Sequence, residues 1–176
     1  KEKYGSNKEA LTVFVADALF HVSSKQVAKA LSEGPSPVST YRYLFTQRVN
    51  WVGAGHAVEI PYIFQSKLSL LYMNYNLLLP LLTPHDFAEQ MRLSNAMVRY
   101  WTNFAHYGNP NGGNPDYSLT EWPEAKTGAV LEFNSKKISV MEKEFRQQEV
   151  DYWMEQSTPK IESRSSAQMC SHIFHR

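Results

Sequence analysis

The sequence predicts a mixed α/β fold that is mostly helical and has a few short strands. Hydrophobic residues make up 43% and aromatic residues 13% of the 176 positions, which is enough to bury a substantial core in one domain. A long stretch after residue 83 carries apolar residues at helical spacing. Two shorter stretches, Thr40–Thr46 and Ala129–Asn134, are rich in strand-forming residues.

The first expected element is a helix over Leu11–Leu31, followed by a strand. Apolar residues recur near helical spacing at Ala16, Phe20, Val27 and Leu31. The turn-forming sequence EGPSP at 33–37 ends this helix. Thr40–Thr46 then alternates aromatic and polar residues, which predicts a strand. His56 falls in the loop that follows.

The most hydrophobic segment, Leu68–Leu82, is shorter than the ~20 apolar residues that a membrane span needs. It is also interrupted by Asn74, Asn76 and Pro80. We therefore expect a buried helix or the wall of a lipophilic pocket here, and no membrane span.

The second long helix has both of its ends marked. Thr83 is suited to cap it, Pro84 fits its first turn, and the acids Asp86 and Glu89 lie near its positive end. The sequence YGNPNGGNPD at 107–116 ends it. The apolar face is expected at Phe87, Met91, Ala96, Val98, Trp101 and Phe104, of which Trp101 and Phe104 are interpreted as core residues.

Ala129–Asn134 is expected to form a short strand and Glu142–Gln156 a terminal helix. The domain is expected over residues 1–156, with a flexible tail over 157–176 because apolar periodicity is lost there. This tail contains three residues that are spaced like metal ligands, Cys170, His172 and His175. Three ligands on a tail make an incidental cluster, so no metal site is predicted.

Charge and cysteine content exclude some partners. The formal net charge is +1 and no long run of one sign exists, so nucleic-acid binding is not expected. Cys170 is the single cysteine, so it closes no intrachain disulfide and does not identify a compartment. The opening KEKYGSNKEA lacks an apolar core, and no secretory signal is expected on this segment.

No self-contained catalytic motif is present. The sequence lacks G-x-S-x-G, a phosphate-binding loop and H-E-x-x-H, and GAG at 53–55 lacks the third glycine of a dinucleotide loop, so no cofactor is predicted. His56 remains as the candidate, because histidine transfers protons near neutral pH and a loop after a strand presents such a group well.

Four segments resemble one family. GAGHAVEIPYIF at 53–64 is similar to the histidine segment of type-B carboxylesterases and cholinesterases. VRYWTNFAHYGNPN at 98–111, followed by Trp122 and Pro123, resembles the end of a family helix. ADALFHVSSKQVAKAL at 16–31, with Asp17, and FRQQEVDYW at 145–153 resemble two more. The four matches occur in the family's order, and the chain resembles a C-terminal fragment of its α/β-hydrolase domain.

The resemblance implies a serine esterase that hydrolyses small-molecule carboxylic esters. Of the family's Ser, Glu or Asp, and His triad, only the histidine lies within this segment, as His56. The serine, the oxyanion-hole glycines and the acid lie upstream in the family, so the missing N-terminal part of the domain is an expected partner. The isolated chain is then expected to be inactive and prone to aggregate.

Each supporting residue has two interpretations. Glu59 either supports the loop of His56 or is a surface carboxylate. Gly53 and Gly55 either let the loop approach the serine closely or satisfy turn dihedrals. No substrate-binding residue is identified. An alternative function is a non-catalytic cholinesterase-like protein used in adhesion, structure or storage.

One departure from the family is informative. Many relatives carry a disulfide between the helix that begins with the aspartate and the closing helix, at the positions of Val22 and Val150. An apolar contact is expected to replace the bridge. The family weakly suggests secretion or an extracellular location, and the loss of the disulfide weakens that inference further.

Overall fold

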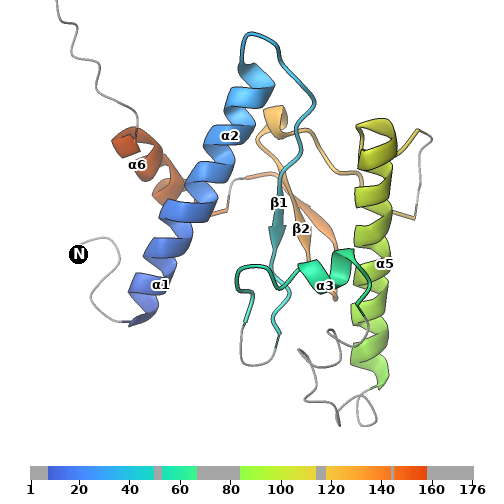
Figure 1. Ribbon diagram of the computed structural model, residues 1–176. Coiled ribbons are helices and arrows are strands. Elements are labelled where there is room, and N and C mark those ends of the chain that lie inside the picture. Colours follow the sequence, from blue (N-terminus) through green and yellow to red (C-terminus); the bar gives the residue numbers. More distant parts are fainter. Residues whose placement is uncertain (1–7, 50–52, 67–83, 114–117, 144, 158–176) are drawn as a thin grey trace, which may run out of the picture. The chain divides into compact units, whose positions relative to one another are not determined.

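The computed structural model describes residues 8–49, 53–66, 84–113, 118–143 and 145–157 (Figure 1). They belong to two compact units. The helical unit takes its residues from Lys1–Ser23 and Arg146–Arg176, and the sheet unit is Ser24–Phe145. Among the helices in these ranges, none has the length and apolarity that a membrane crossing requires. The expectations for Leu68–Leu82, Thr83 and the tail cluster around Cys170 lie outside the described residues.

The helix predicted over Leu11–Leu31 is present but contains an irregularity. α1 (Lys8–Ala16) continues into η1 (Asp17–His21), a π-helical segment, and then into α2 (Val22–Glu33). The predicted apolar face is wrong, because Val27 is 58% and Leu31 47% exposed. A π-helical turn inserts an extra residue, so positions spaced for a regular α-helix on either side of it no longer share one face.

A buried ion pair holds the helical unit together. The Asp17 carboxylate has no exposed surface and accepts hydrogen bonds from Arg146, at 2.8 Å from Nε to Oδ1 and 2.9 Å from Nη2 to Oδ2. Arg146 also lies 3.5 Å from a carboxylate oxygen of Glu149. Two parallel N–H···O bonds fix the direction of both side chains, so this pair sets where the closing helix meets the first one.

The closing helix, α6 (Gln147–Ser157), begins later than the predicted Glu142. Arg146, immediately before it, has a left-handed backbone with φ of 54°, which breaks any helix running in from upstream. Val22 and Val150 are both buried, and α6 contacts η1. Phe14 adds an edge-to-face contact with Trp153 at 5.2 Å between ring centroids. These observations agree with apolar packing between the two helices, and a direct contact between Val22 and Val150 stays a prediction.

The described residues of the sheet unit form three strands in the order β1-β2-β3. β1 (Tyr43–Phe45) pairs in parallel with β2 (Val130–Phe133), with Tyr43 opposite Leu131. β3 (Ser139–Met141) pairs antiparallel with β2 and was not predicted. Both predicted strands are confirmed, although β1 is shorter than Thr40–Thr46. Within the described residues β1 is an edge strand, so one side of its backbone has no neighbouring strand.

α5 (Pro84–Tyr107) is the predicted long helix and begins at the predicted proline. Gly108 ends it with a φ of 67°, and its N–H donates to the Phe104 carbonyl at 2.8 Å, which is the left-handed cap that glycine favours. The short helix α3 (Ile60–Ile63) contacts α5 (Figure 1).

The buried face of α5 differs from the predicted one. Phe104 is 47% exposed, whereas Trp101 packs against the core as expected. The buried stripe includes the polar Gln90 and Ser94. A prediction based only on apolar positions therefore does not find this face. The core cluster joins α3, α5, β2 and the segment before it through Tyr62, Leu93, Met97, Tyr100, Trp122, Leu131 and Phe133.

Candidate functional site

His56 lies in a turn after β1, as the sequence predicts, and its side chain is exposed. The loop that leads to it is closed by a backbone bridge between Val49 and Gly53, with N···O distances of 3.0 and 2.7 Å. Val49 is buried at the base of this bridge. The loop is therefore held to the core at one end and presents the imidazole at its surface.

The turn around His56 is tight. The Val58 N–H faces the Gly55 carbonyl at 3.5 Å, and Ala57 between them has a φ of 66°. A residue with a Cβ in this left-handed region costs roughly 1–2 kcal/mol, which the surrounding contacts must offset. Val58 is buried while His56 is exposed. The turn therefore leaves the His56 side chain exposed while it buries that of Val58, two residues later.

The two glycines have different local roles. Gly53 has a φ of 71°, and no atom lies close enough to exclude a Cβ, so its backbone dihedral is what favours glycine. Gly55 lies outside the positive-φ positions and contributes its carbonyl to the turn. For Gly53 the geometry favours the turn-dihedral interpretation.

Glu59 links the turn to α3 and to β1. Its carbonyl accepts hydrogen bonds from the backbone N–H groups of Tyr62 at 2.9 Å and Ile63 at 3.2 Å. Its carboxylate accepts a longer hydrogen bond, at 3.4 Å, from the Tyr43 hydroxyl. These contacts favour the interpretation that Glu59 supports the loop of His56 over that of an uninvolved surface carboxylate.

Tyrosine ionisation gives a test of this geometry. Burial, with a smaller effect from the nearby Glu59 charge, raises the pKa of Tyr43 from 10.0 to about 12. Burial likewise raises the pKa of Tyr100 to about 12. Between pH 10.0 and about 12 both hydroxyls stay protonated in the folded state, whereas in an unfolded chain they would already be ionised. Their contribution to stability is therefore fully present below pH 10 and is lost as pH rises through about 12.

We expect Glu59→Gln to lower the pKa of Tyr43 toward its ordinary value and to leave that of Tyr100 unchanged. The shift is partial, because burial is the larger cause for Tyr43. Titration of carbon-13-labelled tyrosine rings by NMR measures both groups in one sample. A Tyr43 pKa that is the same in Glu59→Gln as in the unmodified chain contradicts the contact with Glu59.

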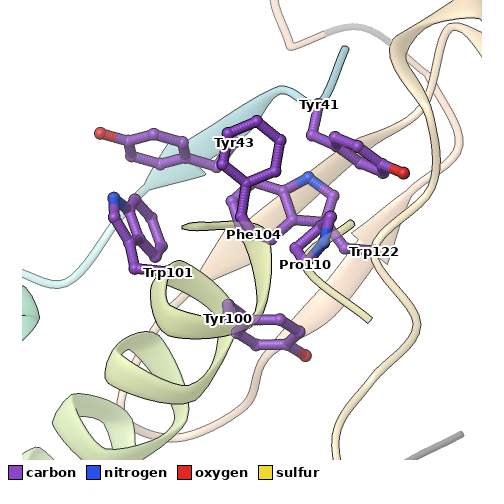
Figure 2. Close-up of a pocket in the computed structure, with 7 residues that line it drawn as sticks. All are labelled: Tyr41, Tyr43, Tyr100, Trp101, Phe104, Pro110 and Trp122. Carbon is purple, nitrogen blue, oxygen red and sulfur yellow. The ribbon is translucent and has the colours of Figure 1, made fainter. Parts of the chain in front are cut away.

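An aromatic pocket of about 170 Å³ lies at the start of β1, formed by Tyr41, Tyr43, Tyr100, Trp101, Phe104, Pro110 and Trp122 (Figure 2). Polar atoms of two lining side chains form hydrogen bonds with backbone carbonyls. The Trp122 Nε1 donates to the Arg42 carbonyl at 2.9 Å, and the Tyr100 hydroxyl donates to the Thr120 carbonyl. The pocket therefore offers ring surfaces and no acid or base. Tyr43 begins β1 and Tyr41 precedes it, whereas His56 follows the end of β1. Tyr43 connects the two regions, because its ring lines the pocket and its hydroxyl donates to the Glu59 carboxylate.

The described part of the chain contains no group of three or more His, Cys, Asp or Glu side chains placed to hold a metal ion. Four residues near the site were not predicted from the sequence as such: Tyr43, Tyr62, Gln90 and Ser94. The only signal for the last two was a pair of polar residues one helical turn apart on a helix that was otherwise interpreted by its apolar positions.

Comparisons with known proteins agree on one family. A family model described as the carboxylesterase family matches residues 1–153. Bile salt-activated lipase of Rattus norvegicus is 30% identical over 155 residues, which cover 83% of this chain and 23% of that protein. Carboxylesterase 1D of Mus musculus is 30% identical over 178 residues, covering 96% of this chain and 27% of that protein.

A solved structure of a thermophilic PNB esterase is similar in fold. It superposes with a TM-score of 0.66 at 21% identity and covers 85% of this chain and 29% of its own. This similarity shows the α/β-hydrolase fold, as the sequence predicts. The chain thus spans less than a third of the relatives it matches. From the family match over most of its length, this chain belongs to the carboxylesterase family.

Proposed function

We propose that this chain supplies the catalytic histidine, His56, of a serine esterase that hydrolyses small-molecule carboxylic esters. The observation that carries the proposal is an exposed histidine in a tight turn after a parallel strand, in a chain of the carboxylesterase family. In open α/β sheets, ligands bind beyond the carboxyl ends of parallel strands, which is the end of β1 that His56 follows.

His56 would act first as a base and then as an acid. It takes the proton from the serine hydroxyl as the oxygen attacks the ester carbonyl, and it gives that proton to the departing alcohol. In the second half of the reaction it takes a proton from water, which attacks the acyl-enzyme, and returns that proton to the serine as the acid is released. The serine, the oxyanion-hole donors and the carboxylate partner of His56 come from the remainder of the domain.

Exposed apolar groups support the need for that remainder. Phe64, after α3, is 77% exposed, and Val27 on α2 and Phe104 on α5 are also exposed. The edge of β1 also has no neighbouring strand among the described residues. Soluble monomers rarely leave large contiguous apolar areas or open strand edges uncovered. We propose that the N-terminal part of the same domain covers these groups.

An organophosphate that reacts with activated serines tests this proposal. We expect the complete protein to be labelled at one serine outside the present chain, with matching loss of ester hydrolysis, because only an activated hydroxyl attacks the phosphorus. The 176-residue chain alone should take up no label. Mass spectrometry of the labelled peptide measures both results. A complete protein that is neither labelled nor active favours the non-catalytic alternative, and a labelled isolated chain contradicts the assignment of the nucleophile.

A further inference from the structure

Two polar side chains lie in the interior of the sheet unit, on the buried face of α5. Gln90 is 6% exposed and Ser94 is not exposed, and they lie one helical turn apart. Both bond to the same residue, the buried Tyr62 of α3. The Tyr62 hydroxyl donates to Gln90 Oε1, and the Ser94 hydroxyl donates to the Tyr62 carbonyl at 2.7 Å. Tyr62 is therefore held through its side chain and its backbone at once.

Tyr62 is joined to the His56 turn by consecutive backbone hydrogen bonds. The Tyr62 N–H donates to the Glu59 carbonyl at 2.9 Å, and the Ile60 N–H donates to the Ala57 carbonyl at 3.3 Å. The Gly55–Val58 turn, which contains His56, precedes them without a break. Because each bond overlaps the next in the sequence, a shift of Tyr62 against α5 moves the His56 turn with it.

We propose that Gln90 and Ser94 are positioning residues, which fix the place of His56 through Tyr62. Packing alone would hold Tyr62 less specifically. Its ring contacts Phe45 at 5.3 Å between centroids and shares a core with Leu93 and Met97, but apolar contact is not directional. Gln90 and Ser94 of α5 bond to the side chain and to the backbone of Tyr62, respectively. Together these two hydrogen bonds allow only one rotation and one register of α3 on α5. The inference rests on the function proposed for His56.

The test uses the complete protein with Tyr62→Phe and Ser94→Ala. We expect kcat for a simple ester to fall roughly ten- to hundredfold, because a displacement of about 1 Å at a reacting group costs up to that factor. KM should change less than about twofold, because substrate contacts are not altered. Tyr100→Phe is the matched control. Tyr100 is also a fully buried tyrosine of the same core, on α5, but its hydroxyl bonds to the Thr120 carbonyl and not to Gln90, so kcat should change less than about twofold.

A double variant separates positioning from stability. Tyr62→Phe leaves the Gln90 side chain buried without the phenol, and adding Gln90→Met replaces the second polar partner with an apolar side chain of similar size. Stability should then recover at least in part, since removing both partners is nearly neutral. We expect kcat to stay low, because the directional contact is still absent. Recovery of kcat together with stability overturns the proposal.

Hydrogen exchange gives a readout that does not depend on catalysis. In Ser94→Ala the backbone amides of Val58 and Ile60 should exchange faster than in the unmodified protein, while those of β2 should not. Unchanged protection at both amides overturns the positioning role. If His56→Ala abolishes turnover while Tyr62→Phe and Ser94→Ala behave like Tyr100→Phe, the positioning fails and the proposed function stands. Normal turnover in His56→Ala overturns the proposed function instead.

Discussion

Replacing His56 with alanine in the complete protein is expected to lower kcat/KM for a carboxylic ester by roughly four to six orders of magnitude. In the proposed mechanism this change removes the group that accepts the serine proton and returns it to the leaving alcohol, and loss of a triad histidine costs about this much in other serine hydrolases. Initial rates with a chromogenic ester measure the effect. Residual activity within tenfold of the unmodified protein contradicts the role.

The control is His106→Ala. His106 is also an exposed histidine, placed in the last turn of α5 against the ring of Tyr107. It has no role in the proposed reaction, so its replacement should leave kcat/KM within about twofold. Because His56 is exposed as well, neither change removes core packing, and both variants should unfold at the same denaturant midpoint as the unmodified protein.

Asp17→Asn is expected to lower the free energy of unfolding by roughly 3 kcal/mol, the lower end of the range for breaking a buried ion pair. The guanidinium of Arg146 would lose its buried counter-charge, and because its side chain is 28% exposed, water offsets part of the loss. Denaturant unfolding followed by circular dichroism measures the change. A loss no larger than that of the control variant below contradicts the importance of the pair.

The control breaks an ion pair at the surface. Lys29 and Glu33 lie 4.0 Å apart on α2 with more than half of each side chain exposed, so Glu33→Gln should cost less than about 1 kcal/mol. Asp17→Leu combined with Arg146→Met provides a second check, because it replaces both charges with apolar side chains. This double variant should be more stable than Asp17→Asn, since it leaves no fully buried charge unpaired, and Glu149, which also loses Arg146, has a partly exposed side chain.

The helices and strands were predictable where local chemistry marks their ends. Pro84 and Gly108 mark both ends of α5, and both act as the sequence predicts. The start of α6 was not predictable, because Glu142, Lys143 and Phe145 have a helical composition but lie outside any helix, and the left-handed backbone at Arg146 comes directly before α6. The face of α5 was misassigned for another reason. Gln90 and Ser94 are buried because Tyr62 bonds to them, and the sequence pattern of α5 contains no information on that partner.

The candidate site was predictable as a segment and less so as a set of contacts. His56 and Glu59 lie three residues apart in one motif, and the structure places them in one turn before α3. Tyr43 joins Glu59 from a strand that the sequence also predicts. The pairing itself depends on how the loop between them folds back, which is fixed by the bridge between Val49 and Gly53. The sequence therefore indicates each element but does not indicate which residues of the two elements face each other.

The parallel pairing of β1 with β2 also sets the order in which the sheet unit forms. The hydrogen bond between Thr46 Oγ1 and Glu132 Oε1 joins residues 86 positions apart. A parallel pair needs a crossover connection, and here that connection contains α5. The entropy of closing so long a loop is lost before the strands gain any bond, whereas a helix grows from contacts within one turn in about a microsecond or less. We therefore expect the meeting of the two strands to limit the refolding rate of this unit, and α5 to form before the sheet.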